Sequence, residues 1–345
     1  MRAVVIVLCL LTSLLLVQTA AASGIDVIDQ KGSLWTYGPL VPVAYAPAKL
    51  EAGAIADGVA VISLTQGKTL VSEATVSASA PLMSGRVYVD VDGPVNTGLA
   101  IANDQKVPAQ ISFYFTDDTG FDFGFGTFTL EPKHNIAAFA NQSPFNLSVP
   151  LQGSLTFSSS VPVAVTALRG VTNERGEFLM TALPVVPLGS TFRGSSVVLP
   201  QFAVGHGWST EIILMNPTDL RLTGKIQFYD AASADVVSLT LNGVTDSVFE
   251  YAIAPRSSVR FVTSDSDSVY GGFVVVTAGY RNPLPQGLSL FSLSKQGITI
   301  TQTGVAAAVP ETSFRTYVGK QEGVHSAITM ANPSDVPAQD RKSVV

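Results

Sequence analysis

The stretch TEIILMNP at residues 210–217 decides the fold, because related stretches occur at two other places in the chain. These read TGLAIAN at residues 97–103 and SAITMANP at residues 326–333. The asparagines that they share, Asn103, Asn216 and Asn332, are 113 and 116 residues apart. That spacing is too long for a solenoid unit and fits one domain copied in tandem. The copies can therefore be compared to find what the fold retains and what it lets change.

Short runs of alternating apolar and polar residues fill the two complete copies. GRVYVDV at residues 85–91 alternates cleanly and predicts a half-buried strand. Leu99 and Ile101 are expected on one face of the strand that follows it. About seven or eight such runs in ~100 residues, with turn residues every 8–12 positions, are typical of an immunoglobulin-like sandwich. The sequence therefore predicts an all-β fold of tandem immunoglobulin-like β-sandwich domains.

Comparison of the copies divides the chain into five parts. VAVISL at residues 59–64 matches VAVTAL at residues 163–168, and FVVVTA at residues 273–278 is matched to the same run. The parts are a signal peptide at 1–22, an incomplete or divergent β domain at 23–80, a first sandwich repeat at 81–190, a second at 191–310, and the truncated start of a third at 311–345.

The third copy does not continue as the other two do. Where they place the apolar runs ISFYF (residues 111–115) and IQFY (residues 226–229), it has DRKSVV at residues 340–345. We hypothesise that the chain is a fragment or a frameshifted product of a longer array. Reading the coding DNA past residue 338 in the other frames tests this hypothesis.

The first residues are typical of a secretory signal peptide. A positive Arg2 precedes an apolar run at residues 3–17, and small residues follow with a cleavage motif near Ala22. The apolar run is short for a membrane-spanning helix, which needs roughly 20 residues, and no later run approaches that length. The only cysteine, Cys9, lies inside this run. We expect a secreted or cell-surface protein without a membrane span after cleavage, held together by burial alone.

The charge composition argues against nucleic acid as a partner. Charged residues make up 13 % of the chain, against a typical value of about 25 %. The net charge is −6, and lysine and arginine do not cluster. Binding to a phosphate backbone requires such clusters.

The three histidines offer no catalytic arrangement. His206 lies in a Gly-His-Gly loop and His134 in a turn, and His325 aligns with Ser209 and Asn96 in the other copies. No two histidines have metal-ligand spacing, and no G-x-S-x-G nucleophile elbow is present. We therefore predict a non-enzymatic protein with no catalytic residue and no cofactor.

Acidic loops could offer oxygen ligands to calcium. The internal comparison weighs against a repeated site, because Asp90 and Asp92 correspond to Ala203 and Gly205 in the second copy. We expect solvated loop residues and no metal, and a calcium titration decides the question. The clusters are Asp90 with Asp92, Asp117 and Asp118 with Asp122, and Asp265 with Asp267.

Trp208 is the one candidate ligand-binding residue. It lies in a glycine-rich loop that leads into a strand, where an indole could stack against a carbohydrate ring. The aligned residues are Val95 and Val324, both apolar, and this pattern fits a residue that covers the core better than a sugar-stacking surface.

Parts of the two copies resemble a known kind of repeat. Residues 85–103, 163–170, 173–178, 208–219 and 254–262 are similar to uncharacterised immunoglobulin-like β-sandwich repeats of large secreted bacterial proteins. The resemblance covers most of residues 85–335 and implies export and a sandwich array. It implies no activity and no functional residues.

Two functions follow from these observations. The first is a non-catalytic structural or adhesion module, secreted or on the cell surface, whose partner is an extracellular glycan or protein. The alternative is a carbohydrate-binding or carbohydrate-active extracellular protein that uses aromatic loops such as that of Trp208.

Overall fold

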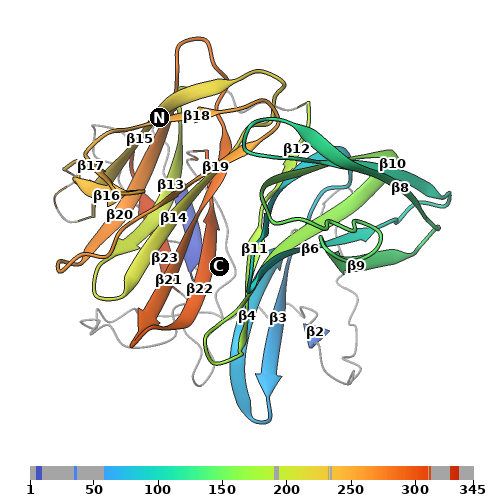
Figure 1. Cartoon of the computed structure of the whole chain (residues 1–345), viewed down its shortest axis with the longest axis horizontal. Coiled ribbons are helices and arrows are strands. Elements are labelled where there is room, and N and C mark those ends of the chain that lie inside the picture. Colours follow the sequence, from blue (N-terminus) through green and yellow to red (C-terminus); the bar gives the residue numbers. More distant parts are fainter. Residues whose placement is uncertain are drawn as a thin grey trace, which may run out of the picture.

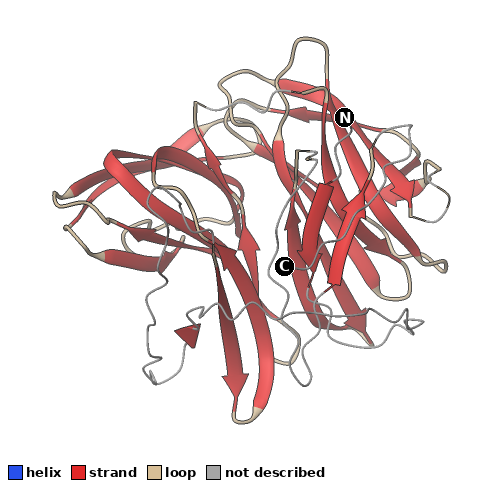
Figure 2. Cartoon of the chain, turned by 180° about the vertical axis from the view of Figure 1, so that it is seen from behind, coloured by secondary structure: helices blue, strands red, loops and turns tan. Residues whose placement is uncertain are grey.

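The computed structural model describes residues 5–9, 35–36, 58–189, 194–231, 233, 235–309, 311 and 327–333. Within these residues the regular structure consists of strands, nearly all of them antiparallel, so the all-β prediction is confirmed (Figure 2). The described residues contain no helix that is long and apolar enough to cross a membrane.

The first unit comprises strands β5 to β12 and has two sheets. Sheet 1A has the strand order β12-β5-β10-β7-β8, and sheet 1B has the order β9-β6-β10-β11. The 22-residue strand β10 belongs to both, because Leu151–Val163 pairs in sheet 1A and residues 164–171 pair in sheet 1B. The strands are β5 (Leu82–Val91), β6 (Val95–Ala102), β7 (Ala109–Thr116), β8 (Asp122–Leu130), β9 (Asn135–Phe139), β10 (Leu151–Thr172), β11 (Phe178–Leu183) and β12 (Val185–Pro187).

The second unit comprises strands β13 to β22 and repeats this arrangement. Sheet 2A has the order β13-β20-β15-β18, and sheet 2B has the order β19-β14-β21-β22. Strands β20 and β21 take the places of the two halves of β10, and a small hairpin, β16–β17, is added. The strands are β13 (Ser196–Val204), β14 (Trp208–Met215), β15 (Leu222–Asp230), β16 (Leu239–Leu241), β17 (Val244–Asp246), β18 (Phe249–Ile253), β19 (Ser258–Val262), β20 (Tyr270–Ala278), β21 (Gln286–Lys295) and β22 (Ile298–Ala306).

This equivalence corrects one match made from the sequence. Residues 273–278 lie in β20, which pairs with β13 and β15 as the first half of β10 pairs with β5 and β7. Val274 lies opposite Phe228 as Leu155 lies opposite Phe115. The counterpart of residues 164–171 is therefore residues 286–293, in β21.

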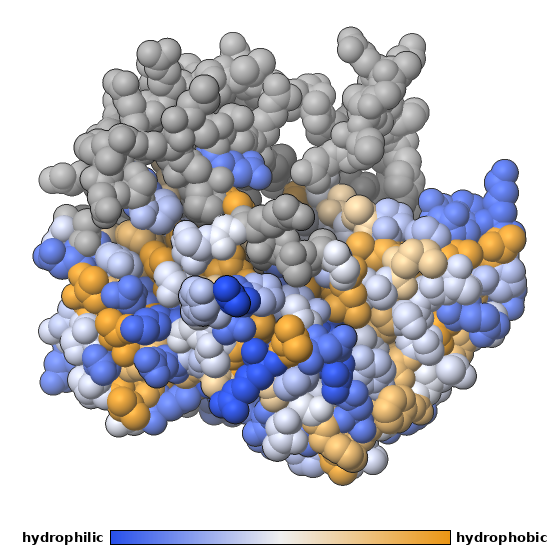
Figure 3. Space-filling model, turned by 90° about the horizontal axis from the view of Figure 1, so that it is seen from above, coloured by the Kyte–Doolittle hydropathy of each residue, from blue (hydrophilic) through white to orange (hydrophobic). Residues whose placement is uncertain are grey.

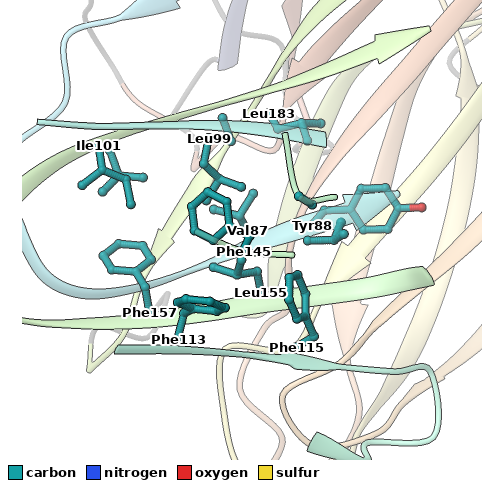
Figure 4. Packing of buried hydrophobic residues seen from close by; sticks show 14 of the residues in the cluster. Val87, Tyr88, Leu99, Ile101, Phe113, Phe115, Phe145, Leu155, Phe157 and Leu183 are labelled. Atoms are coloured by element: carbon teal, nitrogen blue, oxygen red, sulfur yellow. The ribbon is translucent and has the colours of Figure 1, made fainter. Parts of the chain in front are cut away.

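Apolar side chains fill the space between the two sheets of each unit. In the first unit Val87 and Leu155 of sheet 1A face Leu99 of sheet 1B, as Figure 4 shows. Leu99 and Ile101 share the buried face of β6, as predicted. In the second unit Leu199 and Phe228 of sheet 2A pack with Ile212 of sheet 2B. Burial of this kind supplies most of the stability of a chain without disulfides.

Residues 85–91 lie in a strand, as predicted, but the prediction that this strand is half-buried is wrong. Arg86, Tyr88 and Asp90 are buried on one face of β5, and Val87 and Val89 are buried on the other. The outer face of sheet 1A is covered at these three residues because the second unit packs against it there.

The remaining described strands lie outside the two units. β2 (Trp35–Thr36), β3 (Val59–Gln66) and β4 (Thr69–Ser77) form a sheet, and β1 (Val5–Cys9) pairs with β23 (Ala327–Ala331). Strand β4 lies next to β11, and β11 lies next to β22 (Figure 1). The Met180 amide donates a hydrogen bond to Ser72 Oγ (2.7 Å), and Thr181 Oγ1 donates one to the Gln302 carbonyl (3.4 Å). Three hairpins therefore lie side by side.

On the face of the molecule seen in Figure 3, apolar and polar residues are interspersed.

Candidate functional site

Trp208 begins β14 and packs inward as much as it faces solvent. Its half-buried ring lies 6.2 Å from the Phe291 ring, centroid to centroid, and both belong to a small apolar cluster with Val305. A shallow depression nearby is lined by His206, Gly207, Asp265 and residues 294–297, and Trp208 does not line it. The position accordingly has the packing expected of a residue that covers the core.

The histidines that the structure describes lie in separate turns. His134 Nδ1 is 2.9 Å from the Pro132 carbonyl oxygen, and His206 Nε2 is 2.8 Å from the Asp267 carbonyl oxygen. His325 lies outside the described residues. Across the described part of the chain, no group of three His, Cys, Asp or Glu side chains could hold a metal ion.

The acidic residues singled out in the sequence have different structural roles. Asp90 is buried in an ion pair with Arg169, so the expectation of a solvated loop residue is wrong at this position. Asp117 closes a turn by accepting hydrogen bonds from the Thr119 and Phe121 amides (both 2.9 Å). Partial burial acts to raise the pKa of Asp117, but these hydrogen bonds outweigh it and hold the pKa below its usual value.

The shared asparagines tie loops together from inside each unit. Asn103 Nδ2 donates to the carbonyls of Val107 and Leu130 (both 2.9 Å), and its Oδ1 accepts from the Gln105 amide (3.0 Å). Asn216 repeats this pattern with the carbonyls of residues 220, 253 and 254 and the amide of residue 218. Both asparagines are buried. Their recurrence is therefore explained by the fold.

A glycine is repeated for a similar reason. Gly153 and Gly272 occupy equivalent positions, opposite Val89 and Phe202. A Cβ there would lie 2.2 Å from the Thr116 carbonyl oxygen in the first unit and 1.9 Å from the Tyr229 carbonyl oxygen in the second. The neighbouring strand approaches so closely that only glycine fits.

The two units meet at an extensive interface. The apolar side chains of Ile213, Met215, Leu288 and Leu290 point out of sheet 2B and join the core cluster of the first unit. They meet the outer face of sheet 1A, toward which Tyr88 projects, away from the other labelled residues of Figure 4. Sheet 2B is thus buried on both faces.

Hydrogen bonds and ion pairs cross this interface around the apolar centre. Each joins a residue of sheet 1A or its loops to a residue of sheet 2B or of the loops next to its strands β14 and β19. They are Arg86 Nη1 to the Asn216 carbonyl (2.6 Å), Ser154 Oγ to the Arg256 carbonyl (2.5 Å), Ser257 Oγ to the Asp117 carbonyl (2.5 Å), Ser258 Oγ to the Gly153 carbonyl (3.0 Å), and Arg256 to Asp122 (3.0 Å).

Two arginines are buried at the interface: Arg86 donates hydrogen bonds to Thr156 Oγ1 and the Asn216 carbonyl, whereas Arg169 forms an ion pair with Asp90. Arg169 Nη2 lies 2.9 Å from Asp90 Oδ2, and its Nη1 donates to Gln302 Oε1 of the second unit (2.7 Å). The Tyr88 hydroxyl is buried beside these charges and has no hydrogen-bond partner among the described residues. Burial raises the pKa of Tyr88.

Sequence reasoning missed the interface. The alternation in residues 85–91 places Arg86, Tyr88 and Asp90 on one face of β5, which is the usual pattern for a solvent-exposed face. The available signal was the low charge of the whole chain, which leaves few residues for exposed faces.

The comparisons with known proteins give no family. No protein-family model matches the chain. No curated protein matches its sequence either.

Proposed function

We propose that this chain is part of a tandem array of immunoglobulin-like β-sandwich repeats, a non-catalytic structural or adhesion module that is secreted or held at the cell surface. In this proposal sheets 1A and 1B are one repeat and sheets 2A and 2B are the next. Residues 58–77 are the closing hairpin of a preceding repeat, and residues 327–333 open a following one. The partners are extracellular glycans or proteins.

One observation carries the proposal: the contact between the two units recurs beyond the second unit. Met215 and Ala331 precede the shared asparagines of their copies. Met215 packs into the cluster of the first unit, and Ala331 packs with Val198 and Phe273 of sheet 2A. Val198 and Phe273 are the counterparts of Arg86 and Ser154 in sheet 1A, which contact the second unit.

The row of hairpins supports the same reading. Hairpins β3–β4, β10–β11 and β21–β22 follow one another across the molecule, each next to the equivalent hairpin of the adjoining part. Their strands are joined by contacts such as Arg169 with Gln302 and Met180 with Ser72. In this proposal each hairpin is placed beside the next in the same way.

This interface suits a stiff spacer. Interfaces between domains of one chain are usually polar enough to permit relative motion. Here apolar side chains of the second unit are continuous with the core of the first, and Arg256 of the second unit forms an ion pair with Asp122 of the first across the same surface. An array built in this way resists bending, because bending exposes apolar area and separates this partly buried ion pair.

Calorimetry of the full chain tests the coupling of the units. We expect the two units to unfold in one transition, and Met215→Asp to split that transition in two. Met83→Asp is the matched control, because Met83 lies on β5 but is 50 % exposed. Two independent transitions in the unsubstituted chain would contradict the proposal, as would equal behaviour of the two variants.

Export is tested separately. The proposal predicts that the exported chain begins near residue 23, which N-terminal sequencing of the secreted protein measures. A cell-associated chain that keeps residue 1 would contradict export.

A further inference from the structure

The part of the outer face of sheet 1A that the second unit leaves uncovered carries a row of hydroxyl groups. Ser84, Ser158, Ser112 and Thr127 lie opposite one another on the adjacent strands β5, β10, β7 and β8. Neighbouring strands of a sheet are about 4.8 Å apart, so the row is regularly spaced. Ser112 Oγ and Ser158 Oγ are hydrogen-bonded at 2.8 Å.

Two aromatic rings stand beside this row. The ring of Tyr114 on β7 lies 5.6 Å from the ring of Phe125 on β8, centroid to centroid, with an interplanar angle of 30°. Phe125 is 71 % exposed, which is unusual for so large an apolar side chain. An exposed aromatic face next to hydroxyl groups offers both apolar and hydrogen-bonding contact.

The backbone conformation around Phe125 directs its ring outward. The register of β7 and β8 shifts between Phe113 and Phe115, which is the mark of a bulge. Gly124 has φ +62°, and a Cβ at Gly126 would lie 2.4 Å from the Phe113 ring. Bulges commonly redirect a side chain at a functional position. Core rings thus lie directly beneath β8, and Phe125 is directed outward.

The residues around the two rings form one open depression without a charged side chain. Its lining consists of serine, threonine, tyrosine, phenylalanine, glycine and leucine residues from β5, β7, β8, β10 and the segment after β12. A neutral ligand matches such a lining. The Arg86 guanidinium that contacts Thr156 of the lining is buried and is already bonded to the Asn216 carbonyl.

The second unit shows that the fold does not require these residues. The counterparts of Ser158, Ser112 and Thr127 are Thr277, Lys225 and Glu250, which are paired in the same way. The counterpart of Tyr114 is Gln227, opposite Val275. The neutral hydroxyl and aromatic surface is therefore a property of the first unit alone.

We infer that this depression binds a neutral oligosaccharide. Sugar rings have apolar C–H faces that pack on aromatic rings, and their hydroxyls pair with side-chain hydroxyls. The Phe125 and Tyr114 rings serve as the stacking surface, and Ser112, Ser158 and Thr127 bind the sugar hydroxyls. The site is independent of Trp208.

An array of neutral oligosaccharides of glucose, galactose, mannose and N-acetylglucosamine tests the inference on the full chain. We expect the chain to bind at least one series with a Kd of about 1 mM or tighter. Phe125→Ala should weaken that binding at least tenfold, and Thr127→Val, which keeps the side-chain shape, should weaken it severalfold. Phe121→Ala is the matched control, because Phe121 is 65 % exposed in the adjoining turn but does not line the depression. It should bind as the unsubstituted chain does.

Several results would overturn the inference. These are no binding to any series at about 1 mM sugar, equal losses in Phe121→Ala and Phe125→Ala, or binding that Trp208→Ala abolishes and Phe125→Ala leaves intact. Self-association that Phe125→Ala removes, without sugar binding, would assign the surface to a second copy instead. Each variant's circular dichroism spectrum must match that of the unsubstituted chain. Because Phe125 and Thr127 are exposed, their substitution leaves the core intact.

Discussion

Arg169 and Asp90 form a buried ion pair, with 2.9 Å between Arg169 Nη2 and Asp90 Oδ2, at the edge of the interface between the two units. The second unit has Phe291 and Ala203 at the equivalent positions, so one fold accommodates either pair. A buried charge left without its partner is strongly destabilising, whereas an apolar pair of similar volume can be nearly neutral.

The first prediction follows from that equivalence. Asp90→Ala and Arg169→Phe should each cost about 3–5 kcal/mol of the free energy of unfolding. The double variant should cost much less than the sum, because it reproduces the pair of the second unit. Denaturant unfolding in a double-mutant cycle measures the coupling. Additive losses would show that the pair is not energetically linked.

Tyr88→Phe should leave stability unchanged or raise it. The Tyr88 hydroxyl is buried and finds no hydrogen-bond partner within the part of the chain that the structure describes, and a buried polar group without a partner costs about 1–3 kcal/mol. Removing the oxygen keeps the ring in place. The thermal midpoint measures the effect, and a fall of several degrees would mean that the hydroxyl is bonded in solution.

Asn103→Ala and Asn216→Ala should have similar, large effects. Each substitution removes the donor of several buried or partly buried carbonyls, so a loss of about 3 kcal/mol is expected in each unit. Asn141→Ala provides a control at an exposed asparagine. A loss confined to one of the two buried sites would contradict the equivalence of the units.

Acid should weaken the turn at Asp117. Because the folded-state pKa of this group lies below its unfolded value, ionisation stabilises the fold above the unfolded pKa, and this contribution is lost as the pH falls through the folded pKa. Asp117→Asn should therefore lose less stability than the unsubstituted chain below about pH 4. Thermal midpoints at a series of pH values measure the difference. Parallel curves would exclude a contribution from Asp117.

The sequence predicts features that depend on neighbouring residues, such as strand faces and turns. Alternation places Leu99 and Ile101 correctly on one face of β6, because a strand has a period of two whatever it pairs with. The recurrence of Asn103 and Asn216 identifies a turn that each unit needs. Apolar residues stand at the position of Trp208 in the other copies, and this agrees with the packing of the Trp208 ring on Phe291.

The features that the sequence does not predict depend on contacts between residues far apart in the chain. Residues 79 positions apart form the Asp90–Arg169 pair, and no local pattern marks them. The split of one long strand into β20 and β21 misled the alignment of residues 273–278, because both halves of β10 are similarly apolar. The exposed Phe125 had a visible signal in the alternation of phenylalanine with glycine in FDFGFGTF at residues 121–128.

The central claim is that the two units form one rigid body through their shared interface. After replacement of Cys9 the chain has no cysteine, so spin labels can be placed at Thr129→Cys in the first unit and Val244→Cys in the second, both exposed. Pulsed electron–electron double resonance then measures the distance between the labels. If the two units are rigidly joined, the labels should give a single narrow distance distribution, and Met215→Asp should broaden it. A broad distribution in the chain with Met215 intact would contradict this claim.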